Sequence, residues 1–233
     1  MYFNLVGLIR DGNPYTIGLL VDSLTKPTQQ FGVNNLNFFH NLQKALDDVR
    51  VLRHLSADYL YLNRDAFREC NLVALDLNLS DTALHAALGM AREYRKPVCV
   101  DPTSTDIAQR IQPFLPQIEI LTPNVAEAEA ILKCGPIRSS DDALNAARQL
   151  TTLGVKIAVI TQAELGACFA SDQESGQFPA LRGDIVDTTG AGDALTATVI
   201  FGYLQGFSVS ESLKLGLRAA ALTLRSSQTV SPD

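Results

Sequence analysis

The stretch Asp187–Asp193, which reads Asp-Thr-Thr-Gly-Ala-Gly-Asp, decides the fold and the chemistry expected of this chain. It follows a short alternating run, Gly183–Val186, and precedes an apolar run of helical length, Ala194–Leu204. Two glycines at a strand-to-helix junction let the backbone turn tightly and leave N–H groups exposed, with the positive end of the helix dipole behind them. The pattern therefore predicts a phosphate-binding loop.

Asp193 is unusual beside a predicted anion site, because a carboxylate repels phosphate. An acidic residue in the first turn of a helix is common and mildly stabilising, and this is the simplest interpretation of Asp193 by itself. Behind a Thr-Gly-Ala-Gly loop we favour another interpretation. The carboxylate would take a proton from a hydroxyl group that attacks the phosphate.

The same stretch resembles the C-terminal signature of the PfkB/ribokinase family of small-molecule kinases, which usually reads D-T-T-G-A-G-D-A-F-x-A-G. The match is complete from Asp187 to Ala194, and it departs at Leu195 and at Thr198, where relatives usually have a small residue. The chain contains neither a G-x-x-x-x-G-K-[ST] nor a G-x-G-x-x-G sequence, so the P-loop and Rossmann interpretations lose their main support.

The resemblance implies a role for each residue of the stretch. Asp193 corresponds to the general base of the family. The loop that forms the anion hole for the γ-phosphate corresponds to Gly190, Ala191 and Gly192. A monovalent cation such as K⁺ near Asp187 and Thr189 is a further expectation that comes from the family alone.

Composition limits the class of protein. The chain has 233 residues, 46% of them apolar, which suits one large α/β domain with a substantial core. A net charge of −6 and a pI near 5.1 argue against nucleic acid as the main partner. We find no apolar run of membrane-spanning length and no signal peptide, and we therefore expect a cytoplasmic protein. Cys99 and Cys168 lie in apolar runs, which favours buried free thiols.

Apolar runs of strand length alternate with amphipathic helices from Leu72 onward. This order predicts a three-layer α/β sandwich, with a mostly parallel central sheet and helices on both faces. The expected strands are 72–75, 97–100, 118–121, 155–161 and 167–170. The expected helices are 81–95, 125–132, one capped by Ser140 and running to 153, and one opened by a capping box at 208–211 and running to 224.

Polar residues follow several of these strands. Ligands of such sheets bind beyond the carboxyl ends of the strands, so one crevice could collect these side chains. They are Asp76, Asp101, Thr122, Thr161 and Asp187. For Asp101, a packing or loop-capping role is equally compatible with the sequence, and the lysine that relatives often carry shortly after this position is absent.

The segment Thr122–Glu127 reads as a strand end followed by a helix start. Asn124 can cap the helix and Glu127 can complete a capping box, which is a sufficient structural explanation. The resemblance adds a second role, because N-x-x-E after this strand is a family motif that organises Mg²⁺ and its waters around the ATP phosphates. An Mg²⁺ ion that keeps most of its waters needs only such outer-sphere help from Glu127.

The segment Val159–Gly166 lies where relatives carry T-x-G-x-x-G, a loop that contacts the nucleotide. Thr161 and Gly166 match this motif, whereas Ala163 replaces the usual glycine. If that position needs a positive φ, alanine is unfavourable there, and a plain turn between two strands remains an alternative.

The N-terminal region, 1–50, retains only part of the acceptor-binding motif of the family, in contrast to the expected nucleotide-binding core, 72–233. The resemblance places the acceptor near Asp22, Asn37 and Asn41. Asn37 and Asn41 would share a face of a helix, and two solvent-facing amides are an alternative interpretation of this pair. Members of the family are usually longer, and the additional strands and β lid that cover the acceptor are missing between Leu46 and Asp47. Either the chain is naturally shortened, or it joins stretches that are separated in a longer protein.

The sequence thus predicts one ribokinase-like kinase domain over residues 1–233. The expected reaction is ATP- and Mg²⁺-dependent phosphorylation of a hydroxymethyl group on a sugar or nucleoside. The segment Leu72–Leu79 and the ending Thr229–Pro232 resemble the pseudouridine-kinase-like branch. A ribose or fructose-type acceptor and a non-catalytic nucleotide or metabolite sensor are the alternatives, and a homodimer is left open.

Overall fold

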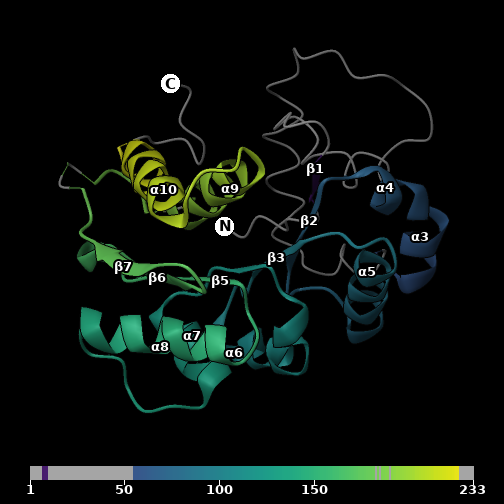
Figure 1. Ribbon diagram of the computed structural model, residues 1–233, viewed down its shortest axis with the longest axis horizontal. Coiled ribbons are helices and arrows are strands. Elements are labelled where there is room, and N and C mark those ends of the chain that lie inside the picture. Colours follow the sequence, from purple (N-terminus) through teal and green to yellow (C-terminus); the bar gives the residue numbers. More distant parts are fainter. Residues whose placement is uncertain (1–6, 10–54, 182, 184, 189, 226–233) are drawn as a thin grey trace. The chain divides into compact units, whose positions relative to one another are not determined.

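The computed structural model describes residues 7–9, 55–181, 183, 185–188 and 190–225 (Figure 1). The contacts divide the chain into two compact units, Met1–Lys96 and Pro97–Asp233. The prediction of one domain over residues 1–233 stays a prediction. The acceptor-side region 10–50, including the position expected for the lid, lies outside the described residues.

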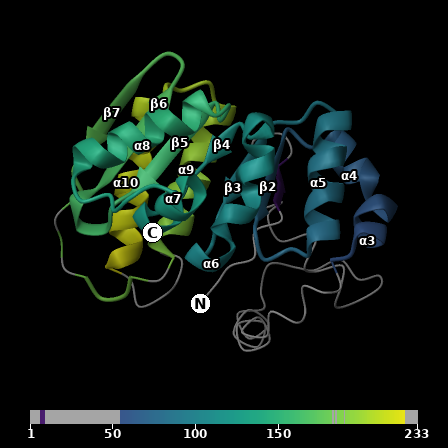
Figure 2. The same ribbon diagram turned by 90° about the horizontal axis from the view of Figure 1, so that it is seen from below.

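In the described part of the first unit, residues 7–9 and 55–96, a strand pair is accompanied by three helices. Strand β1 (Gly7–Ile9) pairs antiparallel with β2 (Leu72–Asp76), and all five residues of β2 are buried. Helix α5 (Asp81–Glu93) contacts α3 (Ala57–Leu62) and α4 (Arg64–Glu69), as Figure 2 shows.

Helix α5 confirms the predicted apolar face. Among the residues that it buries are Ala83, Leu84, Ala87, Leu88 and Ala91. Ser80 caps its N-terminus by accepting a hydrogen bond from the amide of Ala83 at 3.2 Å. The helix ends at Glu93, two residues before the predicted end, because Arg95 adopts a left-handed conformation with φ of 54°.

Five strands lie among the described residues of the second unit, in this order across the sheet: β3 (Val98–Asp101), β4 (Ile120–Leu121), β5 (Ile157–Thr161), β6 (Ala167–Ser171) and β7 (Ser175–Phe178). The first three are parallel, and β6 and β7 continue the sheet as an antiparallel meander. Polar residues that follow β3, β4 and β5 therefore share one edge of the sheet.

Helices cover both faces of this second sheet (Figure 1). Helices α7 (Val125–Leu132) and α8 (Ser140–Thr152) lie on one face, and α9 (Ala191–Leu204) and α10 (Val209–Leu224) lie on the other. Helix α6 (Thr105–Ala108) and the 3₁₀ helices η3 (Gln109–Gln117) and η4 (Ala163–Leu165) connect the strands. The layered α/β architecture confirms the predicted fold class.

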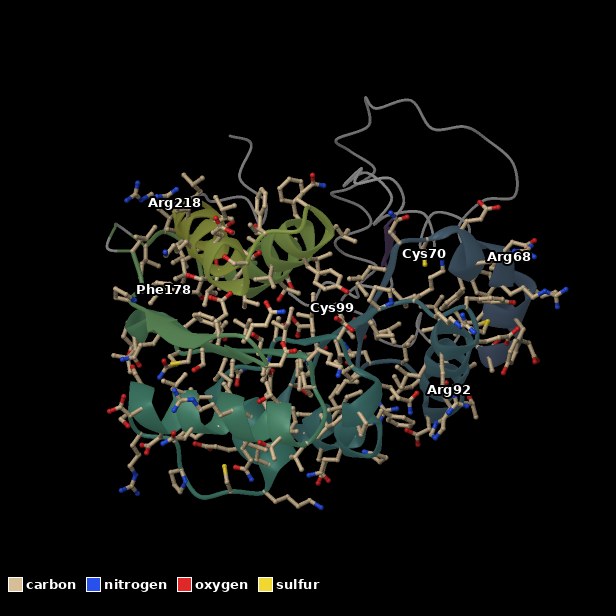
Figure 3. All side chains as sticks on the ribbon, viewed as in Figure 1. Arg68, Cys70, Arg92, Cys99, Phe178 and Arg218 are labelled. Atoms are coloured by element: carbon tan, nitrogen blue, oxygen red, sulfur yellow. The ribbon has the colours of Figure 1, made fainter. Side chains whose placement is uncertain are left out.

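Side chains between the sheet and α10 show how the C-terminal helices are held. Phe178, labelled in Figure 3, stacks on Phe169 with ring centroids 5.9 Å apart, and the ammonium group of Lys214 lies 4.8 Å from its centroid. Gly202 of α9 lies so close to α10 that an added Cβ would come within 2.1 Å of the Ser212 hydroxyl oxygen. The pair α9–α10 therefore packs through a glycine.

Two local predictions are wrong. Ser139, and not Ser140, caps α8, because its hydroxyl accepts from the Asp142 amide while the Asp142 carboxylate accepts from the Ser139 amide. The run 183–186 does not form a strand in its described residues. Ile185 and Val186 are exposed, and the Val186 amide donates instead to the Leu224 carbonyl at the end of α10.

The cysteines follow the expectation from the sequence. Cys99, labelled in Figure 3, and Cys168 are buried free thiols, as is Cys70, whereas Cys134 is exposed. Burial raises the pKa of the Cys168 thiol to about 11, which leaves it unreactive at neutral pH. None of the described helices combines the length and apolar character that a membrane crossing requires.

Candidate active site

The N-terminus of α9 is built differently from those of the other long helices. Side chains cap α5, α7, α8 and α10, whereas the N-cap of α9 is Gly190, which adopts a left-handed conformation with φ of 82°. The first intrahelical hydrogen bond runs from the Ala194 amide to the Gly190 carbonyl at 2.9 Å. The amides of Ala191, Gly192 and Asp193 therefore have no carbonyl partner within α9, as suits an anion-binding helix end.

Gly192 leaves room at this helix end. An added Cβ at Gly192 would meet no heavy atom within 4 Å, so packing against the described residues does not require a glycine there. Glycine in a helix costs about 1 kcal/mol relative to alanine. Close approach of a ligand to the backbone is a physical reason for keeping it.

Asp193 lies in this first turn and is half-buried. Burial, together with the negative charge of Asp101, raises the pKa of the Asp193 carboxyl to about 6. A carboxyl group with this pKa is ionised at neutral pH and accepts a proton more readily than an ordinary aspartate. These properties suit a general base.

Asp101 lies at the end of β3, and its side chain is held by its own loop. Its Oδ1 atom accepts a hydrogen bond from the Thr103 amide at 2.9 Å, so the loop-capping interpretation of Asp101 is correct. Burial raises the pKa of Asp101, while the hydrogen bond from the Thr103 amide and the nearby Thr196 hydroxyl oppose this effect. Asp101 therefore brings further negative charge close to Asp193.

The segment after β4 forms the predicted capping box. The Asn124 amide donates to Oε2 of Glu127 at 2.9 Å, and the Glu127 amide donates to Oδ1 of Asn124 at 3.0 Å. Glu127 is buried, and this burial, with a smaller contribution from the charge of Asp101, raises its pKa to about 7. Asp101 thus interacts electrostatically with both Asp193 and Glu127, which joins the predicted base and the predicted metal-organising residue in one site.

Comparison with known proteins shows the family of the chain. A family model described as pfkB family carbohydrate kinase matches residues 23–233. The chain belongs to the PfkB family. It is 26% identical over 190 residues to the pseudouridine kinase of Escherichia coli, a match that covers 81% of this chain and 60% of that protein. It is 31% identical over 189 residues to an uncharacterised sugar kinase of E. coli, covering 81% of this chain and 51% of that protein.

Solved structures confirm the ribokinase-like fold. A carbohydrate kinase from Agrobacterium tumefaciens matches with a TM-score of 0.67 and 26% identity, over 80% of this chain and 59% of that one. The ribokinase of Arabidopsis thaliana, solved with ribose and ATP, matches with a TM-score of 0.63 and 24% identity, over 72% and 55%. The chain therefore spans 51–60% of the length of these four proteins.

The loop after β5 lies beside the segment that carries Asn124. The Thr161 amide donates to the Pro123 carbonyl at 3.0 Å, and Thr161 forms an isolated parallel bridge with Asn124. The structure thus brings the predicted nucleotide-contacting Thr161 next to the predicted metal-organising segment.

Gly166 ends the same loop and has a packing role of its own. It adopts φ of 99°, and an added Cβ would lie 2.0 Å from the Phe178 carbonyl oxygen. A glycine is required here whether or not a nucleotide binds. The proposed contact between Gly166 and a nucleotide stays a prediction.

Of the remaining predicted site residues, the structure describes Asp187 and not the others. Asp187 is exposed, and its amide donates to the Leu224 carbonyl at 3.3 Å. Thr189 and the predicted acceptor-binding residues Asp22, Asn37 and Asn41 lie outside the described residues. In the described ranges, no group of three or more His, Cys, Asp or Glu side chains is arranged to hold a metal ion directly.

Ala163 stands where the T-x-G-x-x-G pattern of the resemblance has its first glycine, and its φ is 48°. We expect Ala163→Gly to raise the free energy of unfolding by about 1 kcal/mol, because the left-handed conformation is costly for a residue with a Cβ. Urea unfolding measures the change. The control is Ala220→Gly in α10, where loss of about 0.5–1 kcal/mol is expected because the backbone is helical. Equal destabilisation by both substitutions would contradict the strain at Ala163.

Proposed function

We propose that the chain is an ATP-dependent phosphotransferase that phosphorylates a hydroxymethyl group of a sugar or nucleoside. The observation that carries the proposal is the pairing of a half-buried Asp193, with its pKa raised to about 6, and the uncapped first turn of α9. The base and the anion-binding amides then belong to the same helix turn. Membership of the PfkB family supports the assignment of both roles.

The reaction requires a proton acceptor and stabilisation of charge on the transferred group. As the acceptor oxygen forms a bond to the γ-phosphorus of ATP, its proton passes to the Asp193 carboxylate and the bond to the leaving ADP oxygen breaks. The backbone amides of Gly190, Ala191 and Gly192 would donate hydrogen bonds to the oxygens of the phosphoryl group while it is transferred. The positive end of the α9 dipole acts in the same direction.

The described residues fit Mg²⁺ held through water. Asp101, Glu127 and Asp193 bring desolvated carboxyl groups together, and a cation with oxygen ligands would offset their repulsion. Asn124 and Glu127 would orient the waters of the ion, and the bound ion supplies charge neutralisation at the ATP phosphates. Thr161 and Gly166, in the adjacent loop, are proposed to contact the nucleotide, and Asp187 and Thr189 to lie near a K⁺ ion.

The acceptor is proposed to be a nucleoside such as pseudouridine, bound near Asp22, Asn37 and Asn41. The E. coli relative supports this proposal, because its name states that it acts on pseudouridine. Ala163, strained where the T-x-G-x-x-G pattern has its first glycine, favours the non-catalytic alternative instead. An ADP-release assay with pseudouridine, other nucleosides, ribose and fructose derivatives separates these cases, because a non-catalytic sensor would release no ADP with any of them.

Asp193→Asn is expected to lower the acceptor-dependent rate of ADP release by about 10²–10⁴-fold, because the amide cannot accept the hydroxyl proton. Binding of ATP, followed by calorimetry, should persist because the amides of α9 remain. Parental turnover in this variant would show that Asp193 is not the base.

The rate is also expected to depend on pH. Asp193 must be ionised, so kcat/KM should fall as the pH drops through about 6. Asp101→Asn removes a neighbouring negative charge and should move this acid limb to lower pH. The matched control is Asp106→Asn. Asp106 is exposed on the following helix, so this substitution should not change the pH at which kcat/KM falls. A profile that is flat from pH 5 to 8 in the parental protein would contradict the proposed base.

Glu127→Gln is expected to raise the Mg²⁺ concentration for half-maximal activity about 10-fold or more, because outer-sphere partners tune metal affinity. A glutamine oxygen can still accept from the Asn124 amide, so the melting temperature should change little. Glu211→Gln is the control, since Glu211 completes the same type of box with Ser208 on α10. An unchanged Mg²⁺ midpoint with a lower melting temperature would leave Glu127 only its capping role.

A further inference from the structure

Thr196 places a hydroxyl group in an otherwise apolar part of α9. It is 4% exposed, and the other residues with which the helix packs inward are Leu195, Val199, Ile200 and Gly202. A hydroxyl group in such surroundings is costly unless it forms a hydrogen bond. The hydrogen-bond partner of the Thr196 hydroxyl therefore indicates what this residue does in the fold.

The partners of Thr196 lie on other segments of the fold. Its hydroxyl donates to Oγ1 of Thr122 at 3.0 Å, and Oγ1 of Thr122 lies 3.5 Å from the Val100 carbonyl oxygen. Thr122 is also buried, at 5% exposure. The Thr196 hydroxyl also lies near enough to the Asp101 carboxylate to lower its pKa. A single side chain of α9 is thus bonded to the residue that follows β4 and lies beside the end of β3.

Burial alone does not explain these contacts. Thr198, on the same helix, satisfies its hydroxyl by donating to the Ala194 carbonyl at 2.7 Å, one turn earlier. Thr223, which is buried on α10, donates in the same way to the Ala219 carbonyl at 3.1 Å. A threonine in a helix can therefore be satisfied within its own helix. Thr196 instead forms a bond between residues 74 positions apart.

The segments joined at Thr196 are those that carry the acidic residues of the site. Asp193 lies three residues before Thr196, so the two side chains are neighbours on the surface of α9. Asp101 directly follows Val100, and Thr122 lies two residues before Asn124, the N-cap of the helix that carries Glu127. Loss of the Thr196 bond would free α9 to shift relative to both strand ends.

We propose that Thr196 is a positioning residue, whose hydroxyl ties α9 to the ends of β3 and β4 and so sets the distance between the Asp193 carboxylate and the segment Asn124–Glu127. This inference rests on the proposed phosphotransferase function. The contribution of Thr196 is geometric. A catalytic group that is misplaced by about 1 Å can lose about 10²-fold in rate.

Thr196→Val removes the hydroxyl and keeps the branched shape, whereas Thr196→Ser keeps the hydroxyl. We expect Thr196→Val to lower kcat for ADP release by about 10- to 100-fold, with the KM for MgATP changed less than about 3-fold. Thr196→Ser should restore most of the rate. Thr198→Val and Thr223→Val are the controls on α9 and α10, and both should retain the parental kcat, whatever their effect on the melting temperature.

A double-mutant cycle with Thr122→Val tests the bond itself. Since Thr196 and Thr122 share one hydrogen bond, the effects of the two substitutions on kcat should be less than additive. A Thr196→Val protein with parental kcat, or a loss no larger than in Thr223→Val, overturns the positioning role while the proposed function stands. A parental protein that releases no ADP with any acceptor overturns the proposed function, and the positioning role with it.

Discussion

Burial of the carboxyl groups of Asp101, Glu127 and Asp193, to which the negative charge of Asp101 adds at the other two, is the constraint on which the rest of the site depends. Each group is partly removed from water, and the charge of Asp101 raises the pKa of the other two. Such a cluster opposes folding unless hydrogen bonds and oriented dipoles offset it. The Asn124 amide at Glu127, the Thr103 amide at Asp101 and the first turn of α9 at Asp193 provide this compensation.

The same constraint gives the site its chemical character. A carboxylate that is stabilised too well would be a poor proton acceptor, and one left in an apolar pocket would remain protonated. Asp193 lies between these limits, with its pKa near 6. A cation bound among these groups would lower all three pKa values, because opposite charge favours the ionised form. In the proposed site, metal binding and base strength would thus be coupled through Asp101.

The long helices α5, α7, α8 and α10 could be predicted from the sequence to within about two residues, because capping and apolar periodicity are local, whereas the short helices α3, α4 and α6 were not predicted. Asn124 and Glu127 formed the expected box, and α5 buried the expected face. The alternation of polar and apolar residues that ends at Ile185 and Val186 wrongly predicted a strand. A strand needs an adjacent strand to pair with, and the amide of Val186 bonds to the end of α10 instead. The antiparallel edge strand β7 was also not predicted, since its residues, Ser175–Phe178, alternate only weakly in hydropathy.

The site was predictable where a motif is continuous and not where it is assembled by folding. The backbone at Ala163 does have a positive φ, the condition under which the sequence indicated that alanine is unfavourable there. The proximity of Asp101 to Asp193, and the bond from Thr196 to Thr122, depend on the packing of α9 against the strand ends. A threonine within an apolar helical run was the available signal, because a buried hydroxyl must have a partner.

The glycine contact between α9 and α10 has a consequence for motion. Since Gly202 lies directly against Ser212, and Gly216 against Leu195, the two helices touch closely along this seam, and we expect them to move together. Any opening of this part of the molecule would therefore carry both helices as one rigid body. Amide protons in the central turns of α9 and α10 would then exchange with solvent at similar rates, and those of the first turn of α9, outside the helical hydrogen-bond ladder, would exchange sooner.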